Sequence, residues 1–207
     1  MLAIHNTIIN SATTTGIALK RWKLSEVIMI QKEIKNPRIN RLRVLNKYEA
    51  DLNLVFNFFW IKLTTNHLES RNLLVENQWG ARPHQSAENV SLLNEIINKI
   101  HRITCKPLVK LHNDATACYD RMICNLSTLC SRSFGVPSQV CKLQANTLNI
   151  MEYKIQTNHG VSNKTYKSTK ATPIHGQGQG SGHTGTSLVF NSVPMMKVIE
   201  KNVKDAK

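Results

Sequence analysis

Two acidic residues, Asp114 and Asp120, bound the segment of the chain that is best suited to catalytic chemistry. Asp114 follows an apolar stretch, Pro107–Asn113, that favours a short strand, so its carboxylate is expected at the end of that strand. A strand-end carboxylate in a basic chain is a suitable ligand for Mg²⁺, which prefers oxygen donors. Two such ions can stabilise the attacking and leaving oxygens of a phosphoryl transfer. Taken alone, a strand-end aspartate such as Asp114 more often has a simpler function, capping the helix that follows.

Three further segments carry residues suited to binding a nucleotide or a phosphate. The glycine-rich segment 176–182 can bring its backbone close to a ligand, and its Gln179 can bond a base edge. In the loop 78–86, the guanidinium of Arg82 can bind a phosphate through two hydrogen bonds. The segment 32–43 holds five cations and one acid, which favours a polyanion contact. Each pattern also fits an ordinary solvated loop, so none decides the function by itself.

Helices and short strands are expected to position these segments. Apolar residues recur at spacings of three and four, which predicts helices over residues 48–68, 86–102, 119–132, 137–151 and 187–198. Ser86 is expected to cap the second of these helices, and Gly135 to close the third. A strand is expected over 42–45, and residues 153–170 alternate like a hairpin with its turn near His159-Gly160. The order of elements predicts a helix-rich α+β fold with few strands.

The charge and cysteine content narrow the class of protein. Lys and Arg number 27 against 13 Asp and Glu, giving a net charge of +14, which suits a polyanionic partner such as nucleic acid. The five cysteines show no zinc-site spacing and are expected as small core residues in a reducing, intracellular compartment. No apolar run approaches the roughly 18 residues that a membrane span needs, so no membrane partner is expected.

The order of the segments resembles the reverse transcriptase domains of non-LTR retrotransposons and group II introns. Asp114-x-x-x-Cys118-Tyr119-Asp120 is similar to motif A of that family. The segment 176–181, about 60 residues later, resembles motif B, the Gly-x-x-Gln-Gly-Ser turn.

Two upstream blocks extend the resemblance. The segment 78–86 is similar to the Gln-x-Gly-x-Arg finger segment of these enzymes, and residues 22–45 resemble their opening finger block. The resemblance covers residues 21–200 and implies the α+β fold of right-hand polymerase fingers and a partial palm, helix-rich with a short antiparallel sheet. The polar, Thr- and Ser-rich composition of residues 1–20 predicts a loose leader. The resemblance implies a fingers-like helical lobe over 21–106 and a partial palm with motifs A and B over 107–200, and a tail follows over 201–207.

The resemblance also implies the metal and sugar contacts of motif A. Asp114 would bind both catalytic Mg²⁺ ions, with the carbonyl of Ala115 as a further ligand. Tyr119 would lie beneath the incoming sugar and exclude a 2′-hydroxyl, so that deoxynucleoside triphosphates are selected. Asp120 matches the second acid of the motif, and we expect it to be structural.

The remaining contacts implied by the resemblance come from motif B and the fingers. Gln179 and Gly180 would shape the pocket around the nascent base pair. Lys32, Arg43 and Arg82 are candidates for binding the nucleotide, the first two through its triphosphate. The implied partners are an RNA template, a DNA primer and deoxynucleoside triphosphates.

The sequence departs from the family in its later motifs. The Tyr/Phe-x-Asp-Asp motif supplies the remaining metal carboxylates, and the 207 residues contain no Asp-Asp pair. In motif B, the usual Ser-Pro is replaced by Thr184-Gly185. We therefore expect a reverse transcriptase truncated before that motif, and purified 1–207 is predicted not to extend a primer, because one carboxylate holds two Mg²⁺ ions poorly.

Two other functions stay open at this point. An RNA-dependent RNA polymerase fragment is suggested by Ser181-Gly182-x-x-x-Thr186, which resembles motif B of that family, although Tyr119 and the Gln-x-Gly-x-Arg block argue against it. A basic RNA-binding module without catalysis is the other alternative. Its RNA binding would be salt-dependent and unchanged by Asp114→Ala.

Overall fold

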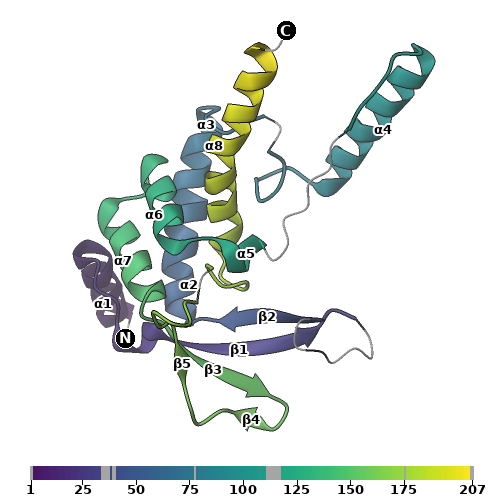
Figure 1. The fold of residues 1–207 in the computed structure, drawn as a ribbon. Coiled ribbons are helices and arrows are strands. Elements are labelled where there is room, and N and C mark those ends of the chain that lie inside the picture. The colour runs from purple at the N-terminus through teal and green to yellow at the C-terminus, as the bar shows by residue number, and fades with distance from the viewer. Residues whose placement is uncertain are drawn as a thin grey trace.

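A layer of helices packs on one face of a sheet (Figure 1). The computed structural model describes residues 2–33, 38, 41–76, 78–110, 118–174 and 176–205. Within them the sheet has five strands in the order β2-β1-β3-β4, with β5 also paired to β3. The strands are β1 (Leu24–Gln31), β2 (Leu42–Lys47), β3 (Glu152–Thr157), β4 (Gly160–Val161) and β5 (Tyr166–Lys167).

The sheet is mixed rather than antiparallel, which corrects the sequence prediction. β1 pairs with β2 antiparallel, but β1 and β3 run parallel, with Leu24 opposite Glu152. The hairpin expected over 153–170 is present as β3 and β4, with Thr157 opposite Gly160. A sequence pattern predicts hairpins because their strands are neighbours in the chain, whereas β1 and β3 lie about 130 residues apart.

The two faces of the sheet have different surroundings. Ser25 and Val27 of β1 are buried beneath the helices, while the alternating residue Leu24 points to the other side and is 38% exposed. The strand register places Arg43 and Lys154 on the same side as Leu24. We refer to this side as the open face, because the helices in Figure 1 lie on the opposite side of the described sheet.

The helices range from single turns to the long α8, and all but α4 belong to the helical layer. They are η1 (Lys20–Lys23), α1 (Leu2–Thr15), α2 (Ala50–Phe56), η3 (Asn57–Thr65), α3 (Asn66–Ser70), α4 (Ala87–Ile103), α5 (Cys118–Arg121), α6 (Cys124–Ser133), α7 (Ser138–Leu148) and α8 (Thr184–Asp205). α2, η3 and α3 follow one another without a break, as expected for 48–68, but the middle part is a π-helix. α6 packs against α7 and α8, and α1 packs against α7. α4 projects away from the layer (Figure 1).

One continuous core holds the layer together. It runs from Ala12 in α1 through Trp22 and Trp60 to Phe190 in α8. The indole N–H of Trp60 donates to the Ser131 hydroxyl at 3.0 Å and joins η3 to α6. The expected fingers-like lobe (21–106) and partial palm (107–200) therefore contribute to the same core.

Residues 2–15 form the helix α1, where a loose leader was expected over 1–20. In α1 the hydroxyl of Thr14 donates to the carbonyl of Asn10, and that of Thr15 to the carbonyl of Ser11. Ala12 is buried against the body, so the helix is held by packing. Threonine-rich composition predicted a loop because these hydroxyls also suit turns, but here they bond one turn back along the helix.

The predicted helix boundaries agree with the structure in two places and differ in others. Ser86 caps α4 by accepting the amide of Asn89 at 3.3 Å, and Gly135 adopts a positive φ of 96° after α6. Both caps are confirmed. The helix expected over 119–132 is split into α5 and α6, and the final helix extends through most of the expected tail to Asp205. For the strand predicted at 107–113, residues 107–110 are not in a strand and 111–113 lie outside the described residues.

The five cysteines are all free thiols, and they differ in burial. Cys141 is buried, Cys105 is exposed, and the other three are intermediate. Burial raises the pKa of the Cys141 thiol to about 11, and a thiol that stays protonated is a poor nucleophile. The expectation of small core residues holds for Cys141, and Cys124 and Cys130 pack partly buried against the core, whereas Cys105 is exposed.

Candidate nucleotide site beside the glycine-rich loop

The glycine-rich loop, residues 176–182, is hydrogen-bonded to α5 and the residue after it on one side and to β2 on the other. The amide of Gly176 donates to the carbonyl of Met122 at 2.9 Å, and that of Gln177 donates to the carbonyl of Tyr119 at 3.2 Å. On the other side, the amide of Asn46 in β2 donates to the carbonyl of Gln179 at 2.7 Å. Backbone hydrogen bonds therefore join three segments that are far apart in the sequence.

The glycines are required by the packing of this loop. A Cβ on Gly176 would lie 2.7 Å from the carbonyl oxygen of Tyr119, and one on Gly180 would lie 2.5 Å from that of Asn46. Both glycines have positive φ, at 102° and 120°. The sequence predicted glycines that let the backbone approach a ligand, and in the structure the backbone approaches neighbouring protein segments instead.

A buried hydrogen-bond network anchors the end of the loop. His183 is fully buried, and the Gln144 side-chain amide lies 2.9 Å from its Nε2, so that Nε2 accepts. Nδ1–H then donates to the hydroxyl of Ser181, which donates to Asn53 Oδ1 at 3.2 Å. Burial lowers the pKa of His183 to about 3, so the ring is neutral at physiological pH. The network fixes the loop against α7 and α2.

A small cavity lies between the loop and the helix-covered face of the sheet. Its volume is about 190 Å³. Its lining residues are Val44, Asn46, Asp120, Tyr153, Tyr166, Ile174, Gly176 and Gly178. We refer to it as the loop cavity. Ligand pockets commonly measure about 300–1,000 Å³. The loop cavity is smaller than this, so it has room for only part of a nucleotide, such as its sugar.

Two tyrosines and one acid give the loop cavity its chemical character. The rings of Tyr153 and Tyr166 stack with centroids 5.3 Å apart. Asp120 supplies the carboxylate on the described wall. Burial raises the pKa of Asp120, and the positive charge of Lys32 acts in the opposite direction. The cavity therefore presents hydroxyl groups, aromatic rings and one acid within reach of a lysine charge.

Several of the predicted site residues meet at this junction. Tyr119 is half-buried in α5, and its carbonyl accepts the amide of Gln177. Gln179 is half-buried in the loop, and Gly180 lies directly against Asn46. Lys32 directly follows β1, and it is close enough for its charge to act on Asp120, the residue after Tyr119.

Arg43 and Arg82 lie elsewhere. Arg43 is exposed on the open face, on the opposite side of β2 from the loop cavity. Arg82 donates from Nε and Nη2 to the two carboxylate oxygens of Glu69, at 2.7 and 2.6 Å. Its Nη1 donates to the carbonyls of Val75 and Gln78, and the hydrogen bond to Glu69 raises its pKa. These contacts order the loop that precedes α4, and they occupy the donors expected to bind a phosphate.

The predicted metal ligands, Asp114 and Ala115, lie outside the described residues. Within the described ranges, no three His, Cys, Asp or Glu side chains gather as metal ligands. Asp120 alone does not fit a Mg²⁺ site, because this ion is usually held by more than one oxygen ligand from protein and substrate. The predicted Mg²⁺ site therefore depends on Asp114.

Sequence reasoning did not identify His183, Gln144 or Asn46 as parts of the site. Their contacts join segments that are distant in the chain, so no local pattern marks them. Sequence reasoning placed Tyr153 and Tyr166 in a hairpin but not in the site. Because they are cross-strand partners on β3 and β5, their side chains lie on the same face of the sheet and both line the loop cavity.

No protein family model matches the chain, and none of the characterised proteins matches it significantly. In the described part of the chain, no helix has the length and apolar character needed to cross a bilayer.

Proposed function

We propose that the chain is the fingers and part of the palm of a template-directed nucleic-acid polymerase of the reverse transcriptase type. The observation that carries the proposal is the junction at the glycine-rich loop, which bonds to Tyr119 on one side and to Asn46 on the other. Tyr119 belongs to the block that resembles motif A and the loop to the block that resembles motif B, while Asn46 directly follows the block that resembles the opening fingers. Their order in the sequence and their hydrogen bonds are independent observations, and both support one site.

The proposed contacts follow from this junction. Tyr119 would lie under the sugar of a deoxynucleoside triphosphate, and Gln179 and Gly180 would border the base pair. Lys32 would bring a positive charge toward the phosphates. Asp114 and Ala115 would hold Mg²⁺, which when bound stabilises the charge on the transferred phosphate. Because Arg82 is already bonded to Glu69, we propose that it positions the loop before α4.

Photo-crosslinking tests the proposed nucleotide site. Purified 1–207 is irradiated with azido-dATP, Mg²⁺ and an RNA–DNA template–primer, and the adducts are mapped by mass spectrometry. Adducts are expected in the peptides that contain Tyr119 and Gln179. Unlabelled dATP should compete better than ATP, because the tyrosine ring excludes the 2′-hydroxyl.

Tyr119→Ala should remove the preference for dATP, while Phe58→Ala, an exposed aromatic in η3, should leave it intact. Adducts in other segments only would contradict the proposed site. A preference for ATP would favour the RNA polymerase alternative instead. Primer extension by 1–207 is not expected, because the sequence lacks the second carboxylate pair.

A further inference from the structure

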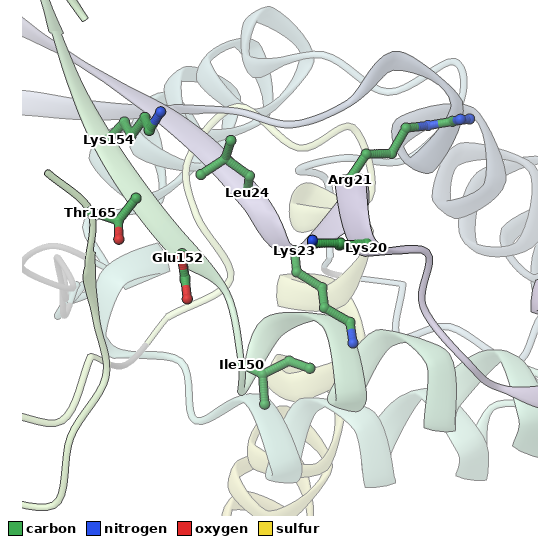
Figure 2. A pocket seen from close by; sticks show the side chains of 8 residues that line it. All are labelled: Lys20, Arg21, Lys23, Leu24, Ile150, Glu152, Lys154 and Thr165. Atoms are coloured by element: carbon green, nitrogen blue, oxygen red, sulfur yellow. The ribbon is translucent and has the colours of Figure 1, made fainter. Parts of the chain in front are cut away.

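A second and larger cavity lies on the open face, where η1 leads into β1 beside β3 (Figure 2). Its volume is about 710 Å³. Three lysines line it, Lys20 and Lys23 from η1 and Lys154 from β3. We refer to it as the lysine cavity. Figure 2 shows Lys20 and Lys23 on one side, and Glu152 on the other.

In the part of the chain that the structure describes, the positive charge of the lysine cavity is only partly balanced by acids. Among the described residues, none of the three lysines lies within 4.0 Å of a carboxylate oxygen, although Lys47 pairs with Glu26 nearby at 3.0 Å. Glu152 is the one acid on the described wall, against three lysines. Clustered like charges repel one another, so a cavity of this kind favours an anionic ligand.

The elements that carry the lysines are firmly held. Trp22, between Lys20 and Lys23, is fully buried, and its indole N–H donates to Asp51 at 2.7 Å. Lys154 is fixed by the parallel pairing of β1 and β3, which sets it opposite Glu26. The backbone segments that carry the three lysines are therefore held beside one cavity by packing and strand register.

The rest of the wall suits a sugar. Leu24 and Ile150 are apolar and 38% and 49% exposed, so they offer a surface against which a ribose or deoxyribose can lie. Arg21 lines the rim, but its guanidinium is paired with Asp51 and points away from the cavity (Figure 2). Cations next to an apolar wall match the alternation of phosphate and sugar in a nucleic-acid strand.

We propose that the lysine cavity binds the phosphate backbone of single-stranded nucleic acid, at a site separate from the loop cavity. A recessed cavity of about 710 Å³ admits a few nucleotides of one strand more readily than a rigid duplex. A membrane surface fits less well, because the lysines line a hollow and none of its lining residues in the described ranges is aromatic. This site requires neither metal nor triphosphate, so it stands independently of the proposed polymerase function.

Fluorescence anisotropy with a labelled single-stranded RNA 12-mer tests the proposal. The variant combines Lys20→Gln, Lys23→Gln and Lys154→Gln. Single-stranded binding weakens with salt by a log–log slope of about −0.7 per neutralised phosphate. The variant should therefore bind at least about tenfold more weakly at 50 mM salt, and its slope should be shallower by about 2.

The matched control carries Lys62→Gln, Lys99→Gln and Lys170→Gln, which remove the same charge from exposed positions elsewhere. This control should bind nearly as tightly as the native chain. Equal weakening of both variants would overturn the proposal, since net charge alone would then explain the binding. Binding to vesicles containing phosphatidylserine but not to RNA would also overturn it.

Lysine acetylation footprinting gives a second readout on the native chain. With RNA present, the cavity lysines Lys20, Lys23 and Lys154 should be protected, whereas Lys99 and Lys170 should react as before. Protection spread evenly over all of these lysines would contradict a defined site.

Discussion

The two faces of the sheet carry cavities of opposite character. On the helix-covered face, the loop cavity of about 190 Å³ lies beside glycines in tight backbone contact and a buried histidine network. On the open face, the lysine cavity of about 710 Å³ is lined by three lysines that have no ion-pair partner among the described residues. Tight packing determines the structure around the loop cavity, whereas positive charge is the main feature of the lysine cavity. Substitutions on the first should therefore alter stability, and those on the second should alter ligand affinity.

Gly180→Ala should produce the largest change in stability. Its Cβ would meet the carbonyl oxygen of Asn46 at 2.5 Å, and backbone atoms cannot move aside as a flexible side chain can. We expect the free energy of unfolding to fall by about 3 kcal/mol. Gly160→Ala is a matched control, because Gly160 has nearly the same φ, 119° against 120°, but open space at its Cβ position. It should lose about 1 kcal/mol in urea denaturation, and equal losses would show that no clash exists.

His183 should make stability depend on pH. Its folded-state pKa of about 3 lies below the ordinary 6.5, so between these values the unfolded chain binds a proton that the folded chain does not. Stability should therefore fall as the pH drops below 6.5, by about 2 kcal/mol between pH 7.5 and pH 5.0. Urea denaturation at both pH values measures this change. His183→Gln should flatten it, whereas His67→Gln, at an exposed position, should not.

Asp51 links the helical layer to the open face, because it belongs to the first turn of α2 and pairs with Arg21 at the rim of the lysine cavity. Burial alone would raise the pKa of Asp51, but hydrogen bonds from Arg21 and Trp22 outweigh that effect and lower it. The stabilisation is therefore present at neutral pH and lost as the pH falls through the folded-state pKa. Asp51→Asn should reduce stability by about 1.5 kcal/mol at pH 7. Thermal melts at pH 7 and pH 3 should show that this deficit shrinks in acid.

The cavity lysines should have the smallest effect on stability. Lys23→Gln or Lys154→Gln breaks no ion pair among the described residues and should change the free energy of unfolding by less than about 0.5 kcal/mol. Chemical denaturation of each single variant measures it. A loss comparable with that of Gly180→Ala would show that these lysines are structural, and the contrast between the faces would fail.

Local sequence signals predicted local structure well. The Ser86 cap, the Gly135 cap, the hairpin turn at Gly160 and the helix over 48–68 all depend on residues within one turn or one strand of each other. Periodicity and capping chemistry are sufficient there, because the interactions join neighbours in the chain.

The parts that could not be predicted depend on contacts between distant residues. The parallel pairing of β1 and β3 and the network around His183 join segments separated by tens of residues or more. Alternation shows that β1 has two faces, but it cannot show that Lys20 and Lys154 share a cavity. The loop glycines were expected to bring the backbone close to a ligand, and the observed close contacts of Gly176 and Gly180 are with protein backbone.

The most direct test of the proposed function is template-dependent nucleotide selection. Purified 1–207 is mixed with Mg²⁺ and an RNA–DNA template–primer that presents one known template base, and retention of each labelled deoxynucleoside triphosphate is measured on a filter. The proposed polymerase site predicts that the complementary triphosphate is retained above the other three, and that Gln179→Ala reduces this difference. Equal retention of all four, unchanged when the template base is changed, would contradict the proposal.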